Sequence, residues 1–533
     1  MNPGLTPPIL SCPDAGRLEA RRFGGAEALE WAAMEQAGRA VGSAVLDDFE
    51  EVGSFPADGR LLVLVGKGHN GGDALIAAQE ILRRHARARA VVGFLFGERS
   101  LRPLAQRAWR ELAQAAGERV TCAGAESWAG AGAAYEVCLD GVFGFQYRPP
   151  LPPAVAAALG RANALPVRLR AAVDLPSGLD EPGAFRADFT YATGLVKEPL
   201  LGCAAAGRVR LIDLGFYSGA QAEGPAAGRR RAGTAPSDRV LTAGLLAPLG
   251  ALRPGQTDKR SYGHLLILGG SRQYPGAVLM NALAALHSGA GLVTVLVPQS
   301  LAAGFAARAP EAMWVGCPET ADGGLALGGL AQFKARLERA SALALGSGLG
   351  REPETLAFAR EAVRLSRTPV LIDGDALQPE IVAAARTRLV LTPHAGEYRR
   401  IAGAAELRAY CARAGATVAL KGPVTRVCSG STDQGRRSAA AAACVYHSFF
   451  GGPVLARGGS GDLLAGLTGG QLAQAAARGE PVLEAVCRGV VWHGLAADAL
   501  ARARGQTAVA VTELIDYLPK TLRAAAATIW SGR

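Results

Sequence analysis

Two glycine-rich turns in this chain each place a carboxylate where acid–base chemistry needs one. The first turn follows an apolar run and ends in Asp73, and the second leads to Asp462 within residues 457–466, which read RGGSGDLLAG. Glycines let a backbone approach a ligand closely, and N–H groups at the start of a following helix favour phosphate. An Asp at that place can accept a proton from a substrate hydroxyl, or it can be an ordinary helix N-cap. The first turn matches neither the dinucleotide nor the Walker phosphate motif.

The first half of the chain carries further oxygen-bearing side chains at the ends of apolar runs. Asp140 ends one run, and Asp174 ends another and is followed closely by Ser177. Together with Asn70 of the first turn, they offer oxygen ligands for a hard cation and a carboxylate for proton transfer. Each Asp taken alone can also be a turn cap.

Four loops in the second half carry polar residues directly after apolar runs. These loops span residues 346–350, 373–377, 392–397 and 421–425. Taken singly, His394 is more often a satisfied loop histidine, and Lys421 is more often a surface charge. All four loops are expected at strand ends, next to the turn before Asp462. This common position favours one shared site instead.

The elements that must position these residues are aliphatic runs separated by helical stretches, which indicate parallel strands covered on both faces. In the first half, strands are expected at residues 60–66, 90–96, 135–140, 168–174 and 209–213. In the second half, they are expected at 264–270, 292–297, 342–345, 370–373, 388–392 and 417–421. Helices are expected from about Asp73, from about Ala277 and from near Asp462. Ligands of such sheets bind at the carboxyl ends of the strands, where the polar residues lie.

The length of the chain predicts more than one domain. Single hydrophobic cores stop growing near about 250–300 residues, and this chain has 533. Residues 218–240 are rich in Gly, Ala, Pro and charge without a periodic apolar pattern, which indicates a linker. We therefore expect one α/β domain over residues 1–217 and a second over residues 241–533.

Composition excludes several classes of protein. Apolar residues make up 49% and charged residues 19%, which is not typical of a disordered chain. The net charge of +11 suggests nucleic acid, but the arginines are scattered apart from the cluster Arg229-Arg230-Arg231, so we expect no nucleic-acid partner. Nine cysteines without CxxC spacing indicate reduced thiols in a cytoplasmic protein. We expect no membrane span and no zinc site.

The first half resembles a known domain. The resemblance is carried by Asn70-Gly71-Gly72-Asp73, Asp140, Asp174 through Asp180, Met34 through Gly38, Asp188-Phe189-Thr190 and Lys197. Over about residues 10–216 the chain is similar to the NAD(P)H-hydrate epimerase domain. The resemblance implies that K⁺ is held by Asn70, Asp140 and Ser177. It also implies that the hydrated nucleotide contacts His69, Asn70, Gly71, Gly72, Asp73, Gly144 and Asp174. The chain departs from the family pattern at His69, Ala74 and Phe145-Gln146.

The second half resembles another family. The motifs that carry this resemblance are Lys259 through Gly263, Pro275-Gly276-Ala277, Gly346 through Gly350, Asp373 through Leu377, Thr392 through Glu397, Lys421 through Thr425 and Gly459 through Asp462. Over about residues 240–525 the chain is similar to the ADP-dependent NAD(P)H-hydrate dehydratase of the ribokinase-like superfamily. The resemblance implies that the hydrate contacts Ala277, Gly348, His394 and Asp462. It implies that the adenine nucleotide contacts Lys421, Gly422, Pro423, Val424, Thr425 and Gly461. The segment before the glycine turn, residues 449–456, departs from the family pattern.

The expected fold class is therefore α/β, with two three-layer domains, a Rossmann-like one followed by a ribokinase-like one. The first would epimerise NADHX and NADPHX with Asp174 as acid and base. The second would dehydrate the S form with Asp462 as base, while ADP becomes AMP and phosphate. The expected cofactors are K⁺ in the first half and Mg²⁺ with ADP in the second, and we expect a homo-oligomer. The alternative is a ribokinase-like kinase of a vitamin precursor, with a non-catalytic N-terminal nucleotide-binding module.

Overall fold

The computed structural model describes residues 5–130, 132–217, 238–430 and 443–531. They form two compact units, of which the first holds described residues of 7–217 and 501–506 and the second holds 5–6, 238–500 and 507–531. Residues 218–237 of the predicted linker, with the Arg229–Arg231 cluster, lie outside the described residues. The domain boundaries at 217 and 241 therefore stay a prediction. The end of the predicted linker is a short strand, because Arg239–Val240 (β8) pairs with Val445–Ser448 (β17).

The first unit is built on a seven-stranded sheet in the order β3-β2-β1-β4-β5-β6-β7, and every pairing in it is parallel. Its strands are β1 (Arg60–Val65), β2 (Arg89–Phe94), β3 (Val120–Cys122), β4 (Tyr135–Gly141), β5 (Val167–Val173), β6 (Phe189–Thr193) and β7 (Arg208–Ile212). The strands expected from apolar runs cover all of these positions except β3, which is only three residues long, and β6.

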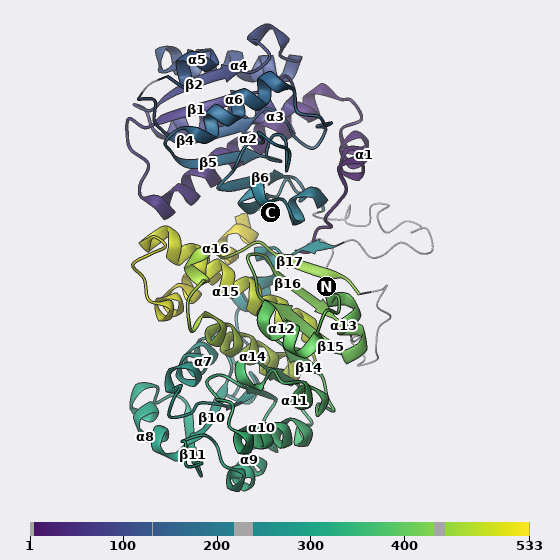
Figure 1. Cartoon of the computed structure of the whole chain (residues 1–533), viewed down its shortest axis with the longest axis vertical. Coiled ribbons are helices and arrows are strands. Elements are labelled where there is room, and N and C mark those ends of the chain that lie inside the picture. Colours follow the sequence, from purple (N-terminus) through teal and green to yellow (C-terminus); the bar gives the residue numbers. More distant parts are fainter. Residues whose placement is uncertain (1–4, 131, 218–237, 431–442, 532–533) are drawn as a thin grey trace. The chain divides into compact units, whose positions relative to one another are not determined.

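Helices cover both faces of this sheet, as Figure 1 shows. They are α1 (Cys12–Phe23), α2 (Glu27–Phe49), α3 (His69–Arg84), α4 (Pro103–Ala116), α5 (Ala125–Trp128) and α6 (Pro153–Ala164), with 3₁₀ turns at Glu50–Val52, Glu98–Ser100, Gly117–Arg119, Glu198–Leu201 and Ala204–Ala206. Alternate residues of β1 enter different cores: Leu61 and Val63 pack with α2, α3 and α4, whereas Leu62 and Leu64 pack with α6. This alternation produces the three layers that the sequence predicts.

The second unit holds a ten-stranded sheet in the order β11-β10-β9-β12-β13-β14-β15-β16-β17-β8. Its other strands are β9 (His264–Leu268), β10 (Leu292–Pro298), β11 (Met313–Cys317), β12 (Ala342–Leu345), β13 (Val370–Ile372), β14 (Leu389–Leu391), β15 (Ala416–Leu420) and β16 (Thr425–Ser429). The expectation of parallel strands is wrong at one edge, because β15, β16 and β17 pair antiparallel. A turn of only four residues joins β15 to β16, and a connection that short permits only a hairpin.

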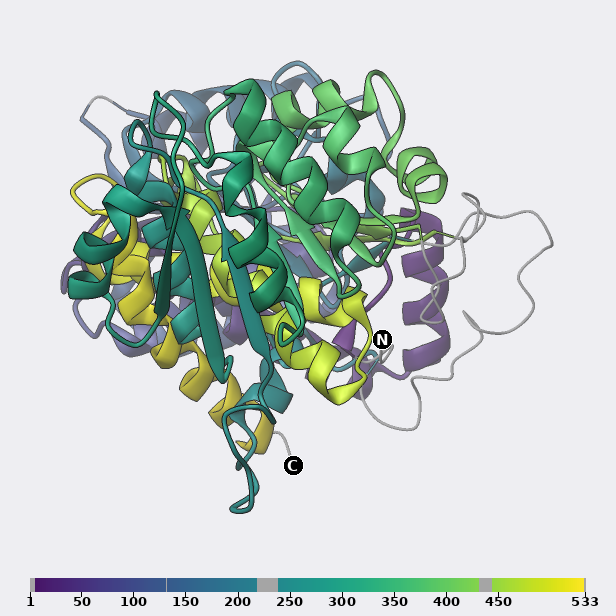
Figure 2. The ribbon, with the colours of Figure 1, turned by 90° about the horizontal axis from the view of Figure 1, so that it is seen from below.

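The helices of the second unit also form two layers (Figures 1 and 2). They are α7 (Pro275–His287), α8 (Gln299–Arg308), α9 (Leu330–Leu337), α10 (Pro353–Leu365), α11 (Pro379–Ala383), α12 (Ala395–Ala402), α13 (Leu407–Ala414), α14 (Ser460–Arg478), α15 (Val482–Arg504) and α16 (Leu518–Ser531), with 3₁₀ turns at Ala243–Gly250, Leu327–Gly329, Gly374–Ala376, Pro453–Leu455 and Val511–Tyr517. Helices α9 to α13 share one apolar core with β9, β12, β13 and β14. Helix α14 packs on α7 and on strands β9 and β12.

Both helices that follow the glycine-rich turns begin earlier than predicted. Helix α3 begins at His69 and α14 at Ser460, so Asp73 and Asp462 lie inside their helices, near the first turn, and not before them. Glycine costs helix propensity, but close packing requires it here. A Cβ at Gly71 would lie 2.6 Å from the Gly66 carbonyl oxygen, and one at Gly72 would lie 2.6 Å from Met34 Sδ.

Candidate active sites

The first site lies at the carboxyl ends of β1, β4, β5 and β6. Asp140 is the last residue but one of β4 and is fully buried. Ser177 follows β5 and is also fully buried. Ser177 donates from its N–H to Asp140 Oδ2 (2.7 Å) and from its hydroxyl to Asp140 Oδ1 (2.7 Å). Burial raises the pKa of Asp140 to about 6, and the hydrogen bonds from Ser177 and Val142 oppose that rise.

Asp174 forms the second polar pair of this site with Lys197, and both side chains are almost completely buried. Lys197 Nζ donates to Asp174 Oδ1 and to the Thr193 carbonyl (2.8 Å). The N–H of Phe145 donates to Asp174 Oδ2 (3.0 Å). Asp174 has φ 65°, a backbone conformation that costs a non-glycine residue energy and is typical of functional positions. The sequence resemblance included Lys197 but did not predict this pair.

The start of α3 faces the same pair. Asn70 Nδ2 donates to the Phe143 carbonyl (2.9 Å), and Asn70 Oδ1 is buried without a hydrogen-bond partner among the described residues. A Cβ at Gly144 would lie 3.0 Å from Asp174 Oδ2 and 3.3 Å from Asn70 Oδ1. The structure therefore brings Asn70, Gly144 and Asp174 together. Burial, together with the Asp174 carboxylate, raises the pKa of Asp73 well above its ordinary value.

His69 differs from its neighbours in the turn. Its side chain is 52% exposed, and Nε2 lies 3.8 Å from Glu30 Oε2. It therefore lies at the rim of the site, while Gly71, Gly72 and Asp73 are buried behind it.

Helix α1 covers this site, which sequence reasoning did not predict. Leu10, just before the helix, forms a parallel bridge to Lys197, and a Cβ at Gly16 would lie 3.4 Å from the Phe145 ring. Glu19 of α1 faces the Asp174–Lys197 pair. Burial raises the pKa of Glu19 to about 7, with Lys197 lowering it and Asp174 raising it. No motif marks Glu19, because a single Glu on a polar helix carries no pattern.

The second site lies at the carboxyl ends of β12 to β15 and at the start of α14. Lys421 Nζ donates to Asp373 Oδ1 (2.9 Å) and lies 3.9 Å from Glu397 Oε2. Burial disfavours the charge of Lys421, yet the carboxylates of Asp373 and Glu397 raise the pKa of its amine. A Cβ at Gly461 would lie 3.0 Å from Lys421 Nζ, so the ammonium touches the glycine turn. Beside it, the hairpin turn holds the exposed Gly422 and Pro423 and the half-buried Val424, and Thr425 begins β16.

Asp462 is the carboxylate at the start of α14. Gly459 caps this helix with φ 93°, a left-handed conformation that a side chain would disfavour. Burial and the nearby Asp373 carboxylate raise the pKa of Asp462 to about 6, while a hydrogen bond from Ser347 and the Lys421 charge lower it. His493 of α15 is also buried, and burial lowers the pKa of its imidazole to about 4.

The remaining predicted residues of this half fall in two groups. A Cβ at Gly348 would lie 2.9 Å from the Ala277 Cβ, so these two loops meet. His394 caps α12: its Nδ1 accepts from Gly396 N (3.0 Å), and its own N–H donates to Glu397 Oε2 (2.9 Å). The structural alternative for His394 is thus realised. The His394 side chain is 61% exposed, so a ligand can reach it. A contact between His394 and a ligand stays a prediction.

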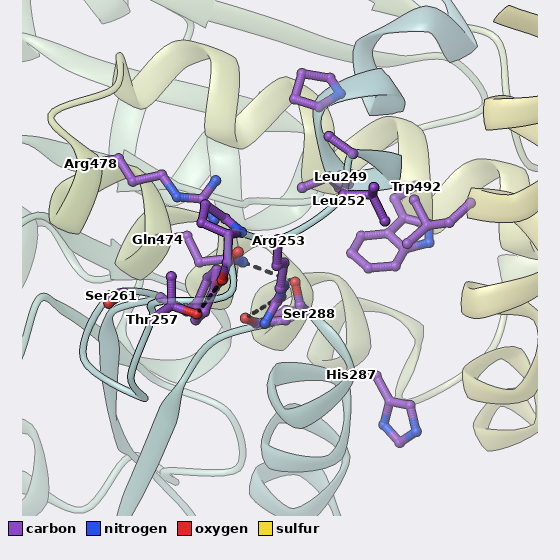
Figure 3. Close-up of a pocket in the computed structure, with 16 residues that line it drawn as sticks. Leu249, Leu252, Arg253, Thr257, Ser261, His287, Ser288, Gln474, Arg478 and Trp492 are labelled. Carbon is purple, nitrogen blue, oxygen red and sulfur yellow. Dashed lines mark hydrogen bonds between the residues drawn. The ribbon is translucent and has the colours of Figure 1, made fainter. Parts of the chain in front are cut away.

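The motif Lys259 through Gly263 does not join this site. It precedes β9, at the end of the sheet opposite to the loops above. There its residues Ser261 and Tyr262 line the pocket in Figure 3 together with Gln474 and with Arg253, whose guanidinium lies 3.8 Å from the centre of the Tyr262 ring. In the described part of the chain, no cluster of three or more His, Cys, Asp or Glu side chains is arranged to hold a metal ion. No described helix is both long and apolar enough to cross a membrane.

Fold and sites define a two-unit α/β enzyme with a buried carboxylate–lysine cluster at the strand ends of each unit. Comparisons with known proteins agree. Residues 265–520 match the family described as NAD(P)H-hydrate dehydratase, and residues 31–198 match the YjeF-related protein N-terminus. The chain belongs to the family of bifunctional NAD(P)H-hydrate repair enzymes.

Two relatives span nearly the whole chain. It is 37% identical to the bifunctional NAD(P)H-hydrate repair enzyme Nnr of Gloeobacter violaceus, over 91% of this chain and 92% of the relative. It is 33% identical to the enzyme of the same name from Thermosynechococcus vestitus, over 98% of each. Among solved structures, an ADP/ATP-dependent NAD(P)H-hydrate dehydratase from Bacillus subtilis, co-crystallised with ATP/Mg²⁺, is 25% identical. That match covers 55% of this chain and 100% of the other, with a TM-score of 0.45.

Proposed function

We propose that this chain repairs hydrated nicotinamide dinucleotides, NADHX and NADPHX, in two steps. The first unit interconverts the R and S hydrates, and the second converts the S hydrate to NAD(P)H as ADP becomes AMP and phosphate. Family membership supports both activities. The observation that carries the second is the half-buried Asp462 in the first turn of α14. Its neighbour Gly461 lies so close to Lys421 that a Cβ there would be 3.0 Å from the ammonium nitrogen.

In the second unit, Asp462 takes the proton of the substrate hydroxyl. The hydroxyl oxygen then attacks the terminal phosphorus of ADP, and AMP leaves with the electrons of the broken P–O bond. The N–H groups at the start of α14 and the Lys421 ammonium stabilise the transferring phosphoryl group. Phosphate, now a good leaving group, departs from the ring, and the neighbouring carbon loses a proton to restore the nicotinamide double bond. Residues Gly422 to Thr425 hold the nucleotide beside Lys421.

Mg²⁺ fits this half as a companion of the nucleotide. Mg²⁺ is commonly bound through substrate phosphates and water with one or two carboxylates, so a dedicated protein cage is not needed. When bound, it would supply positive charge to the phosphates.

Mixing the enzyme with each epimer of NADHX, ADP and Mg²⁺ tests the proposal. NADH, followed by its absorbance, should form from the S epimer only when ADP is present. From the R epimer it should form no faster than epimerisation. No NADH from either epimer would refute the dehydratase, and a stable phosphorylated product from another substrate would favour the kinase alternative.

The dehydratase should lose activity in acid. Asp462 accepts a proton only as a carboxylate, and its pKa is raised to about 6. Below that pH the ionised fraction, and with it the rate, should fall about tenfold per pH unit. Initial rates of NADH formation at saturating ADP across pH test this. A rate that stays constant down to pH about 4 would contradict it.

In the first unit, Asp174 is the group that moves protons at the hydrated carbon. Loss of the hydroxyl as water and its return from the opposite face would invert that carbon. Lys197 holds the Asp174 carboxylate in place, and the Phe145 N–H fixes its second oxygen. The altered loop at 144–147 thus keeps a main-chain contact to Asp174, which supports an active epimerase and not a passive module.

K⁺ fits beside this site. Asn70 Oδ1 is a buried acceptor without a hydrogen-bond partner among the described residues. Asp140 is a fully buried carboxyl that accepts from the neutral groups of Ser177 and Val142. We assign the cation to Asn70, Asp140 and Ser177. When bound, it would balance the Asp140 charge.

Asn70→Ala should remove the response of the protein to K⁺. A ligand at about 100 times its Kd stabilises the folded state by about 2.7 kcal/mol. The melting temperature of the wild type should therefore be higher in KCl than in tetramethylammonium chloride. This difference in melting temperature should vanish in the Asn70→Ala variant. Asn163→Ala, which removes another hydrogen-bonded amide of this unit, is the matched control and should keep the difference. If KCl raised the melting temperature of both variants equally, Asn70 would not be a ligand of the cation.

The remaining expectations extend this proposal. In the described part of the chain no two cysteines form a disulfide bond, which is consistent with a cytoplasmic location. Assembly into a homo-oligomer stays a prediction, and light scattering of the purified chain tests it.

A further inference from the structure

A row of three polar side chains crosses the carboxyl ends of three neighbouring strands in the second unit. Thr392 follows β14, Asp373 follows β13 and Lys421 follows β15. Asp373 Oδ1 accepts from Thr392 Oγ1 over 2.7 Å and from Lys421 Nζ over 2.9 Å. Thr392 is fully buried, and Asp373 is almost completely buried. The scheme above uses Lys421 but gives no part to the other two residues.

The row ends at the start of α14. A Cβ on Gly461 would lie 3.0 Å from Lys421 Nζ. In the proposed scheme, the N–H groups of this first helical turn hold the transferring phosphoryl group. The Lys421 ammonium thus lies beside the place where the phosphoryl charge would develop, and the Asp373 carboxylate is its hydrogen-bond partner.

Hydrogen bonds fix the main chain on both sides of the contact between Asp373 and Lys421. The Asp373 N–H donates to the Leu345 carbonyl (3.0 Å), and the Lys421 N–H donates to the Pro393 carbonyl (2.8 Å). The Lys421 side chain is different, because its ammonium is carried at the end of a flexible four-carbon stem. A fixed and buried carboxylate therefore gives the ammonium a position that the main chain alone does not give.

The direction of the hydrogen bonds agrees with this order of support. An ammonium can only donate, and an ionised carboxylate can only accept. Thr392 has one hydroxyl proton, and its 2.7 Å contact with Asp373 is shorter than its 3.5 Å contact with the Ile372 carbonyl. The proton therefore points to Asp373, so that Thr392 supports the carboxylate and the carboxylate supports the ammonium.

Other titratable groups act on Lys421 from α12, α14 and α15. Glu397 Oε2 lies 3.9 Å from Lys421 Nζ, which is beyond hydrogen-bond distance. Asp462 also favours the Lys421 charge, whereas burial lowers the pKa of His493 to about 4 and keeps it neutral at higher pH. Burial lowers the pKa of the Lys421 amine, but the carboxylates raise it by more. Asp373 adds a direction to this attraction, because it accepts a hydrogen bond.

We propose that Asp373 is a positioning residue of the dehydratase, which holds the Lys421 ammonium at the start of α14, and that Thr392 anchors the Asp373 carboxylate. This inference rests on the proposed function of the second unit. Asp373 acts through Lys421, and Thr392 acts through Asp373.

A double-mutant cycle in the full-length chain tests whether Asp373 acts through Lys421. With S-NADHX, ADP and Mg²⁺, Asp373→Asn should lower kcat by up to about 100-fold, which is the loss that a misplacement of about 1 Å can cause. The KM for S-NADHX should change little. In a Lys421→Met background, Asp373→Asn should cause no further loss, because residues that act together are not additive. Losses that multiply in the double variant would overturn the inference.

The alkaline limb of the pH–rate profile gives a second readout. Lys421 must be protonated to stabilise the phosphoryl group, and an opposite charge shifts a pKa by about 1–3 units. Without the Asp373 charge, the ammonium should lose its proton more easily, so the rate of Asp373→Asn should fall at a pH about 1–3 units below that of the wild type. A merely structural role for Asp373 would lower the rate equally at every pH. An alkaline limb at the wild-type pH would therefore contradict the proposal.

Thr392→Val tests the anchor of the row. It removes the hydroxyl and keeps the shape, so kcat should fall by less than in Asp373→Asn, and the alkaline limb should stay in place because the Asp373 charge remains. Thr392→Ser keeps the hydroxyl and should restore the wild-type kcat. If Thr392→Ser were as slow as Thr392→Val, the hydroxyl would have no part in the row.

Thr417→Val is the matched control. Thr417 is a buried threonine near the start of β15, at the other end of the strand from Lys421, and its hydroxyl is hydrogen-bonded to Ser429 Oγ (2.9 Å). Its replacement should leave kcat unchanged, and a loss equal to that of Thr392→Val would exclude Thr392 as the anchor. A wild type that forms no NADH would refute the proposed function itself, which is a distinct result.

Discussion

Asp462→Asn should lower the rate of NADH formation by about three orders of magnitude, because general base catalysis contributes about 10²–10⁴-fold. Asparagine has almost the same shape but cannot accept the hydroxyl proton. The amides of α14 and Lys421 stay in place, so ADP should still bind. Stopped or continuous absorbance assays with S-NADHX measure the rate, and calorimetric titration with MgADP measures the binding.

Asp258→Asn is the control for this variant. Asp258 is also an aspartate of the second unit that caps a turn, with its Oδ1 accepting from Arg260 N (2.8 Å), but it is exposed and lies before β9. Its replacement should leave turnover unchanged. Near-normal turnover in Asp462→Asn would remove Asp462 from the role of base.

Asp174→Asn should abolish most of the epimerisation, with a loss of about 10²–10⁴-fold. The measurement follows conversion of a single purified epimer by chromatography without ADP. This substitution leaves the Lys197 ammonium buried without its ion-pair partner, which costs about 3–5 kcal/mol of stability. Loss of activity alone would therefore not separate a chemical role from unfolding.

A double variant separates the two effects. Asp174→Asn with Lys197→Gln removes both buried charges and should regain much of the lost stability, as followed by thermal unfolding, while epimerisation remains absent. Dehydration of the S hydrate by the same chain should continue and serves as an internal control. A stable double variant that epimerises at the wild-type rate would exclude Asp174 as the acid and base.

Much of the architecture could be predicted from the sequence, because the central strands are continuous aliphatic runs. Runs such as 61–65 and 265–268 leave few alternatives to buried parallel strands. The prediction of parallel strands was wrong for the edge from β15 to β17, because the short turn between β15 and β16 decides the direction of the strands that follow it. It also missed the beginning of α3 and α14, since glycines in a first helical turn are read locally as loop.

The candidate sites could be predicted where a motif marks them and not where packing creates them. In the sequence, apolar runs end at Asp140, Asp174 and Lys421, and a glycine turn leads to Asp462. In the structure, Asp140 is hydrogen-bonded to Ser177, and Asp174 is paired with Lys197. Lys421 is paired with Asp373. The Lys197–Asp174 contact spans 23 residues and depends on the path of the chain after β6. Glu19 carries no local signal, because Asp174 and Lys197, which it faces, come from distant elements.

The almost completely buried Lys197–Asp174 pair has a consequence for attempts to engineer this enzyme. Replacing a buried ion pair by apolar residues of similar volume is often neutral or stabilising by about 1–4 kcal/mol. A screen of random variants that rewards heat resistance alone would thus tend to discard both charges and enrich robust but inactive chains. Thermostable versions of this protein should be selected on turnover after heating, so that the pair is retained while the rest of the core improves.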